Sequence, residues 1–318
     1  MFKARMAAFV VLAALLAVTG CGAGASTTDS AAPNAGVKIN TKPDQHRERA
    51  QRVDEIAKLV PEPIRAQGAL VVGTTGNTTP PLSFRADDDR TIIGVEPDIA
   101  QLVADVLGLR LDLRATSWEN LFLSVETGQY TAGFSNITVT EERKDKYDFA
   151  GYRKDTIAFE VREDRDLTVS GPADLAGLRV GVSAATNQEQ ILLRWDERNK
   201  AAGLSPIQFQ YYPNSNDYYL ALRSGRIDTY VGPNPGAAYH AAVTGESKVV
   251  GTVSGGGDVP AEIAAMTKKG NGLAEALRRA LAVVIGNGQY AEVLRRWDLA
   301  SEAVPESRVN PPGLPRQK

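Results

Sequence analysis

The stretch FSNITVTEER at residues 134–143 joins the end of a predicted strand to the start of a predicted helix. Phe134 and Ser135 end the strand, and Thr140 is a typical N-cap that places Arg143 in the first helical turn. Arg143 can therefore point back towards the loop. There its guanidinium would form a bidentate pair with a carboxylate, worth about 1.5–3 kcal/mol.

Strands alternate with amphipathic helices on both sides of this stretch. Residues 69–74 form a short apolar strand. A helix starts at Glu96 and Pro97 and is closed by Gly108. Its apolar residues recur at helical spacing: Ile99, Leu102, Val103, Val106 and Leu107. This alternation predicts an α/β fold with mostly parallel strands.

The chain also repeats one layout. Residues 123–134 and residues 220–231 each read as a helix end, a glycine cap and a strand that runs into a loop. Val72-Gly73 and Val180-Gly181 occupy similar places at the end of a preceding strand. Two such instances favour two lobes of similar α/β construction over one large sheet.

The first 21 residues have the pattern of a bacterial lipoprotein signal. Lys3 and Arg5 precede an apolar run of 13 residues at positions 6–18, and Cys21 follows small residues. The run is shorter than the roughly 20 residues that span a bilayer. We expect cleavage after residue 20, lipid on Cys21, and a protein tethered to the outer face of the cell membrane. The alternative is an ordinary secretory signal.

Composition excludes several classes of function. Loss of Lys3 and Arg5 with the signal leaves 34 basic against 38 acidic residues, a net charge of −4, with no basic footprint for nucleic acid. With Cys21 carrying lipid, no disulfide can form. His46 and His240 are the only histidines, so we expect no metal site and no histidine-based catalytic triad.

Two further segments precede the globular part. Residues 22–41 are rich in Gly, Ala, Ser and Thr and predict a flexible tether. Residues 46–59 predict an amphipathic helix packed on the first lobe, with a stalk of no direct function as the alternative.

From residue 70 to about residue 298, the order of motifs resembles the extracellular solute-binding proteins of ABC importers, specifically family 3, the polar amino-acid type. The matching segments are residues 70–74, 94–100, 136–143, 147–150 with 152, 180–182, 186–188, 225–228, 288–290 and 296–297. Together they cover nearly the whole mature domain, which makes the resemblance more specific than any single motif.

The resemblance implies a two-lobed, type II periplasmic-binding-protein-like α/β fold, with two crossover strands joining the lobes. The predicted boundaries are a signal at 1–20, a tether and helix at 21–61, lobe 1 at 62–161 and 260–305, lobe 2 at 162–259, and a tail at 306–318. The predicted hinges lie near residues 159–161 and 258–260.

The resemblance also implies a ligand between the lobes. Arg143 would hold its carboxylate, helped by Ser135, Asn136, Ile137 and Thr138. The alternative for Arg143 is a surface ion pair with Glu141 or Asp145.

From the second lobe, Thr186, Asn187 and Gln188 would present amide groups to the same carboxylate, unless they form only an ordinary helix cap. Trp118 would cover the ligand side chain, or else belong to the core.

One position departs from the family pattern. Pro233 stands where an aspartate commonly holds the ligand's α-ammonium. Thr75, Asn77 and Asn234 could offer neutral oxygens instead. The prediction of a carboxylate-bearing ligand is therefore firmer than that of a standard α-amino acid.

We therefore expect the lipid-anchored, monomeric receptor of an ABC importer. It would capture a small polar carboxylate, an amino acid or close relative, and deliver it to permease and ATPase subunits without a cofactor. The alternatives are a dehydratase-like enzyme on the same scaffold and a ligand sensor that takes no part in transport.

Overall fold

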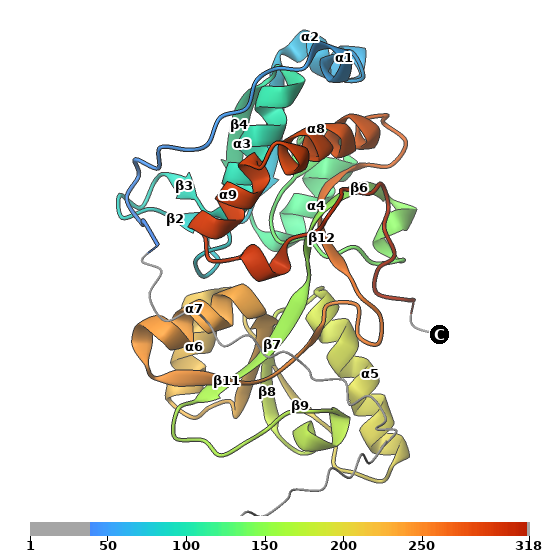
Figure 1. Cartoon of the computed structure of the whole chain (residues 1–318). Helices are drawn as coiled ribbons and strands as arrows, with labels where there is room; N and C mark the ends of the chain where they lie inside the picture. Colours follow the sequence, from blue (N-terminus) through green and yellow to red (C-terminus); the bar gives the residue numbers. More distant parts are fainter. Residues whose placement is uncertain (1–38, 317–318) are drawn as a thin grey trace, which may run out of the picture. The chain divides into compact units, whose positions relative to one another are not determined.

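The computed structural model describes residues 39–316, which form two lobes, each built on a five-stranded sheet (Figure 1). The predicted signal, Cys21 and most of the predicted tether lie outside these residues. Within them, no helix is both long and apolar enough to cross a bilayer.

The first sheet has the strand order β4-β1-β5-β12-β6. Its strands are β1 (Ala69–Thr74), β4 (Arg110–Ala115), β5 (Ala132–Gly133), β6 (Tyr147–Lys154) and β12 (Glu262–Lys268). Strands β4, β1 and β5 run parallel, whereas β12 is antiparallel to β5 and β6. A small hairpin pairs β2 (Phe84–Arg85) with β3 (Ile92–Ile93).

The second sheet has the order β11-β7-β10-β8-β9. Its strands are β7 (Thr156–Arg162), β8 (Arg179–Val182), β9 (Gln208–Tyr211), β10 (Thr229–Pro233) and β11 (Ser247–Ser254). Strands β10, β8 and β9 are parallel, and β7 is antiparallel to both of its neighbours.

Helices cover both sheets. In the first lobe these are α1 (Asp54–Ala57), α2 (Glu62–Gln67), α3 (Val95–Leu107), α4 (Trp118–Glu126), α8 (Ala274–Gly286), α9 (Gln289–Arg296) and the 3₁₀ turns η1 (Arg143–Asp145) and η3 (Ala300–Glu302). In the second they are η2 (Pro172–Leu175), α5 (Asn187–Ala201), α6 (Ser215–Arg223) and α7 (Asn234–Thr244).

Helix α3 shows why the pattern of apolar residues predicts the fold. Its apolar residues are fully buried or nearly so, and α3 packs against α8 and α9. Gly108 ends it at φ 68°, a left-handed conformation that favours glycine. The predicted strand at 69–74 and the predicted helix at 96–107 are confirmed.

The repeated layout corresponds to equivalent units in the two lobes. Gly128 follows α4 at φ 83°, and Gly225 follows α6 at φ 70°. The strand after each glycine pairs in parallel with an earlier strand of its own sheet, β5 with β1 and β10 with β8: Gly73 lies opposite Gly133, and Gly181 lies opposite Tyr230. The two halves therefore share one strand-pairing scheme.

The chain crosses between the sheets twice, once from β6 to β7 and once from β11 to β12 (Figure 1). The sequence placed the first crossing near residues 159–161. In the structure β7 already pairs within the second sheet from Thr156, because β10 and β11 bond to its two edges. Asp155 links the two crossings: its N–H donates to Ala261 O (3.0 Å), and its carbonyl accepts from Gly255 N (3.0 Å).

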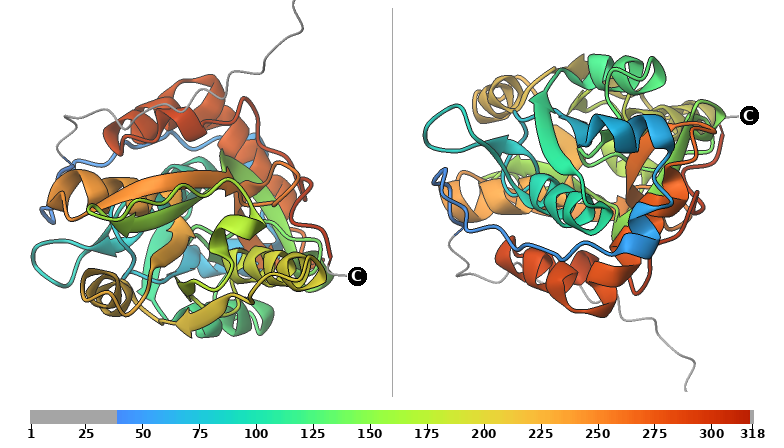
Figure 2. Two further views of the ribbon diagram at one scale, coloured as in Figure 1. Left: turned by 90° about the horizontal axis from the view of Figure 1, so that it is seen from below. Right: turned by 90° about the horizontal axis from the view of Figure 1, so that it is seen from above.

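The predicted helix at 46–59 is wrong, because only Asp54–Ala57 is helical. The preceding residues run extended along α3, where Arg47 pairs with Asp98 at 2.8 Å and Arg49 pairs with Asp105 at 2.7 Å. Figure 2 shows this blue segment beside the red-orange helices α8 and α9. The spacing of apolar residues in this segment is compatible with a helix, but its ion pairs with buried carboxylates hold the backbone in a non-helical conformation.

Candidate functional site

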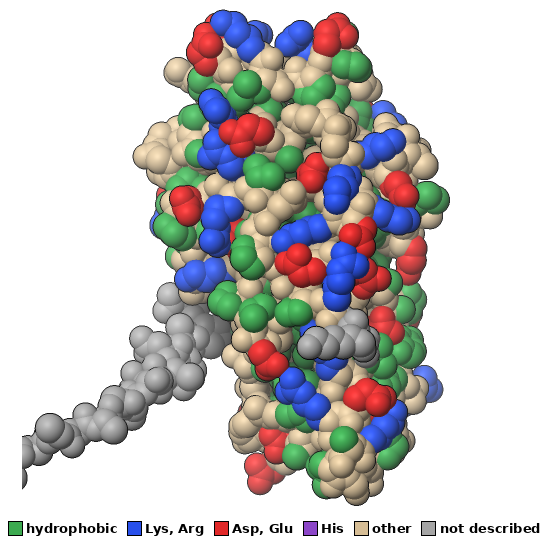
Figure 3. Space-filling view, turned by 90° about the vertical axis from the view of Figure 1, so that its right-hand side faces the viewer, with side chains coloured by type: hydrophobic (Ala, Val, Ile, Leu, Met, Phe, Trp, Pro, Cys, Tyr) green, Lys and Arg blue, Asp and Glu red, His purple; other side chains and the backbone are tan. Residues whose placement is uncertain are grey.

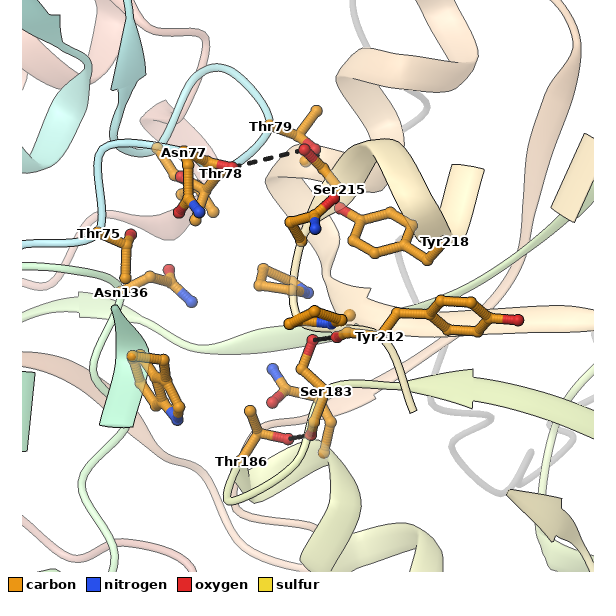
Figure 4. Close-up of a pocket in the computed structure, with 18 of the residues that line it drawn as sticks. Thr75, Asn77, Thr78, Thr79, Asn136, Ser183, Thr186, Tyr212, Ser215 and Tyr218 are labelled. Carbon is orange, nitrogen blue, oxygen red and sulfur yellow. Dashed lines mark hydrogen bonds between the residues drawn. The ribbon is translucent and has the colours of Figure 1, made fainter. Parts of the chain in front are cut away.

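A cavity of about 430 Å³ lies between the two lobes and is lined by residues from both. Its first-lobe wall comes from the segments after β1, β4 and β5, and its second-lobe wall from those after β8, β9 and β10. These are the carboxyl ends of parallel strands, where α/β sheets commonly bind ligands. Figure 4 shows Thr75, Asn77 and Asn136 across the cavity from Ser183, Thr186 and Tyr212.

The structure brings eight of the twelve predicted ligand residues to this cavity. They are Thr75, Asn77, Trp118, Ser135, Asn136, Thr186, Asn187 and Gln188. Ile137, Thr138, Arg143 and Asn234 are not among its lining residues. Ile137 is fully buried in the first-lobe core, and Thr138 is 1% exposed. Direct contact of all twelve with a ligand stays a prediction.

Hydroxyl groups fix the first-lobe wall. Thr75 N donates to Ser135 Oγ at 3.0 Å, and the hydroxyls of the two residues lie 2.9 Å apart. One residue earlier, at the end of β1, Thr74 Oγ1 donates to Ser83 Oγ at 2.7 Å. The polar wall is therefore held in place by its own hydrogen bonds.

A buried charge cluster supports Asn136 from behind. Asn136 has a φ of 51°, and its Oδ1 accepts from Arg153 Nη2 at 2.5 Å. The same guanidinium pairs with Glu96 at 2.7 Å and with Glu302. All three charged side chains are buried, so two carboxylates share one guanidinium. Burial raises the pKa of Glu302 to about 7, although Arg153 opposes this rise.

Arg143 lies at the contact between the lobes. Arg143 N donates to Thr140 Oγ1 at 3.0 Å, as the predicted cap requires, although the turn that follows is 3₁₀. Its Nη1 donates to Thr138 O at 2.9 Å, and its Nη2 donates across the lobes to Ala185 O at 3.1 Å. The guanidinium lies 5.4 Å from the ring centroid of Trp118.

The charge of Arg143 has no carboxylate partner within 4.0 Å among residues 39–316. Of its two suggested surface partners, Glu141 pairs with Lys144 and Asp145 pairs with Arg316. Burial lowers the pKa of Arg143 to about 10, with Asp155 opposing the change. Arg143 therefore remains a cation whose hydrogen bonds go to carbonyl oxygens, next to the cavity wall.

Ala185 joins the lobes through one carbonyl. Besides Arg143, it accepts from Trp118 Nε1 at 3.2 Å. Ala185 itself has a φ of 58°, in the left-handed region that glycine adopts most readily. Trp118 thus lines the cavity with its ring and ties the lobes with its N–H.

Asp155, between the lobes, organises two of the predicted residues. Its Oδ2 accepts from Thr138 Oγ1 at 2.7 Å and from Asn187 Nδ2 at 3.0 Å. Asn187 also donates to Gly255 O on the second crossing, at 3.0 Å. Thr138 and Asn187 therefore connect each lobe to the hinge, and Asn187 still lines the cavity.

Helix α5 begins at the second-lobe wall. Thr186 is its N-cap, with Oγ1 accepting from Glu189 N at 3.2 Å. The amides of Asn187 and Gln188 lie in the first turn of this 15-residue helix, where the dipole favours an anion. Thr186 also donates to Ser183 O at 2.7 Å (Figure 4). The residue is thus a helix cap that also lines the cavity.

Tyrosines form much of the second-lobe wall, and sequence reasoning missed them. Tyr211, Tyr212, Tyr218 and Tyr230 line the cavity. The rings of Tyr218 and Tyr230 stack with centroids 3.6 Å apart. Thr79 of the first lobe lies 3.1 Å from the Tyr218 hydroxyl. The sequence carries no local signal for this wall, because Tyr218 and Tyr230 come from different elements and belong to one buried hydrophobic cluster.

The cavity has little charge. Among its lining residues in the described part of the chain, only Glu119 is charged, and its side chain is exposed. Pro233, at the position where an acid was expected, does line the wall, beside Gly232. Within residues 39–316, no group of three acidic, histidine or cysteine side chains is placed to hold a metal ion.

Comparison with known proteins decides the family. The sequence profile of the bacterial extracellular solute-binding proteins, family 3, matches residues 70–300. The chain belongs to this family. The predicted family is thereby confirmed, whereas the lipoprotein signal lies outside the described residues.

The names of the similar proteins describe amino-acid-binding proteins. The L-cystine-binding protein TcyJ of Escherichia coli (strain K12) is 32% identical over 166 residues, covering 52% of this chain and 59% of TcyJ. The chain thus spans about three-fifths of that relative's length. The arginine-binding protein ArgT of Corynebacterium glutamicum is 28% identical over 260 residues, covering 81% of this chain and 83% of ArgT.

A solved structure supports the architecture. An ancestral arginine-binding protein bound to arginine matches with a TM-score of 0.63 and 26% identity, over 72% of this chain and 98% of that one. The predicted two-lobed periplasmic-binding-protein fold is confirmed by this likeness and by the two sheets.

Proposed function

We propose that this protein binds a polar amino acid in the cavity between its lobes and delivers it to the permease of an ABC importer. One observation carries the proposal: hydrogen-bonding groups from both lobes line a single cavity of about 430 Å³. That volume lies in the usual range for small-molecule sites. The cystine- and arginine-binding relatives support an amino acid as the ligand.

The ligand carboxylate would lie at the start of α5. The amides of Asn187 and Gln188 supply donors there, and the helix dipole adds favourable potential. Arg143 is separated from this place by the Ala185 carbonyl that it now contacts. A carboxylate that displaces this carbonyl would give the guanidinium the anionic partner that it lacks among the described residues.

The ligand side chain would be polar and uncharged. The wall offers tyrosine rings, hydroxyls and amides, and its one charged residue, Glu119, is exposed. Burying a charged side chain without a partner is costly, so such a wall selects against both acidic and basic side chains. Neutral oxygens of Thr75 and Asn77 would serve the α-ammonium in place of an acid at position 233.

The remaining parts of the proposal concern location. Export fits a family of extracellular proteins, and lipid on Cys21 would keep the protein at the membrane beside its permease. We further propose that the protein is monomeric and that it does not catalyse a reaction.

A panel of ligands tests the proposal. The purified protein is heated with glutamine, cystine, arginine, glutamate or a cyclic carboxylate, and bound ligand is quantified by calorimetry. At 100-fold excess over Kd, a true ligand adds about 2.7 kcal/mol of stability. We expect this shift with a neutral polar amino acid. An unmoved melting temperature across the panel, or conversion of the cyclic carboxylate, would contradict the proposal.

Two matched variants locate the site. Arg143→Ala should weaken binding at least about tenfold, because a charge-assisted pair is worth 1.5–3 kcal/mol. Arg278→Ala removes an arginine that pairs with Glu275 on α8 and does not line the cavity, so it should bind as the wild type does. Equal affinity in both variants would exclude Arg143 as the carboxylate anchor.

A further inference from the structure

Residues 306–316 lie beyond the part of the chain that matches the family, and the sequence predicted them only as a tail. In the structure this segment pairs with the first lobe. Gly151 N donates to Arg308 O at 3.0 Å, and Asn310 N donates to Phe149 O at 2.9 Å. The Asn310 side chain completes the pairing by accepting from Phe149 N at 2.9 Å.

Further along, the segment pairs with the stretch that leads to Arg143. Leu314 N donates to Val139 O at 3.1 Å, and Glu141 N donates to Leu314 O at 2.9 Å. Gly313 allows this approach, because a Cβ there would lie 2.1 Å from Val139 O. The backbone of residues 139–141 is thus held on one side by residues 313–314.

The side chain of Leu314 belongs to the other lobe. It is fully buried in the second-lobe core, in the cluster that contains Phe159, Ile191 and Trp195. On the crossing between β11 and β12, a Cβ on Gly257 would lie 3.7 Å from Leu314 Cδ1. Leu314 therefore contacts both lobes at the hinge, through its backbone on one side and its side chain on the other.

Charged residues flank this contact. Arg194 of α5 donates to Pro315 O, and Arg316 donates to Glu141 O at 3.0 Å and pairs with Asp145. Figure 3 shows acidic and basic side chains interspersed on the side of the molecule that faces right in Figure 1. The flanking pairs are exposed and contribute little to the stability of this contact. The buried Leu314 side chain therefore provides most of the attachment between this segment and the second lobe.

We propose that residues 306–316 are a strap that holds the two lobes together and makes Leu314 the positioning residue for the Arg143 segment. Rotation of the lobes about the two crossings must either draw Leu314 out of the second-lobe core or break its pairing with Val139 and Glu141. The strap therefore limits opening of the ligand-free protein. The strap also slows release of the bound amino acid, an effect that rests on the proposed function.

The first test uses ligand-free wild-type protein. Hydrogen exchange measured by NMR should show the amides of Leu314 and Glu141 protected to the same degree as those of the crossings at Asp155 and Gly255. Exchange as fast as that of a frayed terminus would overturn the proposal. The result does not depend on any variant folding or on the identity of the ligand.

The second test uses two variants of the strap. Leu314→Ala removes the second-lobe contact and keeps the backbone pairing, whereas Val309→Ala changes a side chain that is 38% exposed on the same segment. In small-angle X-ray scattering without ligand, Leu314→Ala should have a larger radius of gyration than the wild type, and Val309→Ala should not. An unchanged radius in a folded Leu314→Ala protein would overturn the proposal.

The dissociation rate then links the strap to binding. For an amino acid that passes the panel test, Leu314→Ala should release it at least about threefold faster, since affinity differences between related complexes lie mostly in the dissociation rate. Equal rates in the two variants would overturn the claimed effect on release. Because the exchange and scattering tests need no ligand, a failed strap and a failed binding function remain distinguishable.

Discussion

Ala185 is the residue at which local strain and lobe contact coincide. Its carbonyl accepts hydrogen bonds from Trp118 and Arg143 of the opposite lobe, and its φ is 58°. A left-handed conformation costs a non-glycine residue about 1–2 kcal/mol. The contact between the lobes therefore depends on a backbone conformation that is unfavourable for Ala185.

Replacing this alanine measures the strain. Ala185→Gly should leave the free energy of unfolding unchanged or raise it by up to about 1 kcal/mol, because glycine relieves the strain but loses more chain entropy. Ala185→Val should lower it, since β-branched residues tolerate this region poorly. Urea unfolding of both variants checks the prediction, and a loss above about 1 kcal/mol in Ala185→Gly would contradict it.

The buried cluster behind Asn136 makes stability depend on pH. Burial raises the pKa of Glu302 from 4.5 to about 7, against the opposing charge of Arg153. Between these values the folded state holds a proton that the unfolded state has released. The contribution is thus complete below pH 4.5 and is lost as the pH rises through about 7.

Glu302→Gln isolates this titration. The wild type should lose stability relative to the variant between about pH 5 and pH 7.5, with no further divergence above that range. Urea unfolding of both proteins at several pH values gives the difference. Parallel stability curves across this range would show that Glu302 has an ordinary pKa when folded.

At the scale of elements, the start of α5 is both a structural cap and part of the cavity wall. Thr186→Ala removes the side-chain acceptor for Glu189 N and should cost about 1 kcal/mol of folding stability, as N-cap losses typically do. The matched control is Thr168→Ala, an exposed threonine in the loop before η2 that caps no helix. Equal thermal stability of the two variants would contradict the capping role.

Elements with strong local patterns could be predicted from the sequence, and those set by distant partners could not. The α3 pattern sufficed because one face of a helix had to be buried. The segment at 46–53 carries a similar pattern but is not helical. Arg47 and Arg49 form ion pairs with Asp98 and Asp105, and these pairs hold the segment along α3. Sequence spacing contains no information about such pairs, which join residues about 50 positions apart.

The same distinction applies to the site. Residues in the loops that follow strands, such as Thr75, Ser135 and Thr186, could be predicted because strand ends converge. The tyrosine wall could not be predicted, because it depends on Tyr218 of α6 stacking on Tyr230 of β10, a contact between two separate elements. The direction of the Arg143 guanidinium also depends on Ala185, 42 positions away in the other lobe.

For the molecule as a whole, two crossings, the Ala185 contact and residues 306–316 all join the lobes around one cavity. The cavity wall and the contact between the lobes therefore share residues, among them Trp118 and Asn187. A ligand that satisfies groups of both lobes would stabilise the arrangement in which they face each other.

A crystal structure of the protein with the amino acid that it retains through purification tests this account most directly. The account predicts that amino acid in the cavity between the lobes, with its carboxylate at the amides of Asn187 and Gln188 and its side chain against Tyr218 and Tyr230. An empty cavity in that crystal, or the amino acid bound anywhere else on the protein, would contradict it.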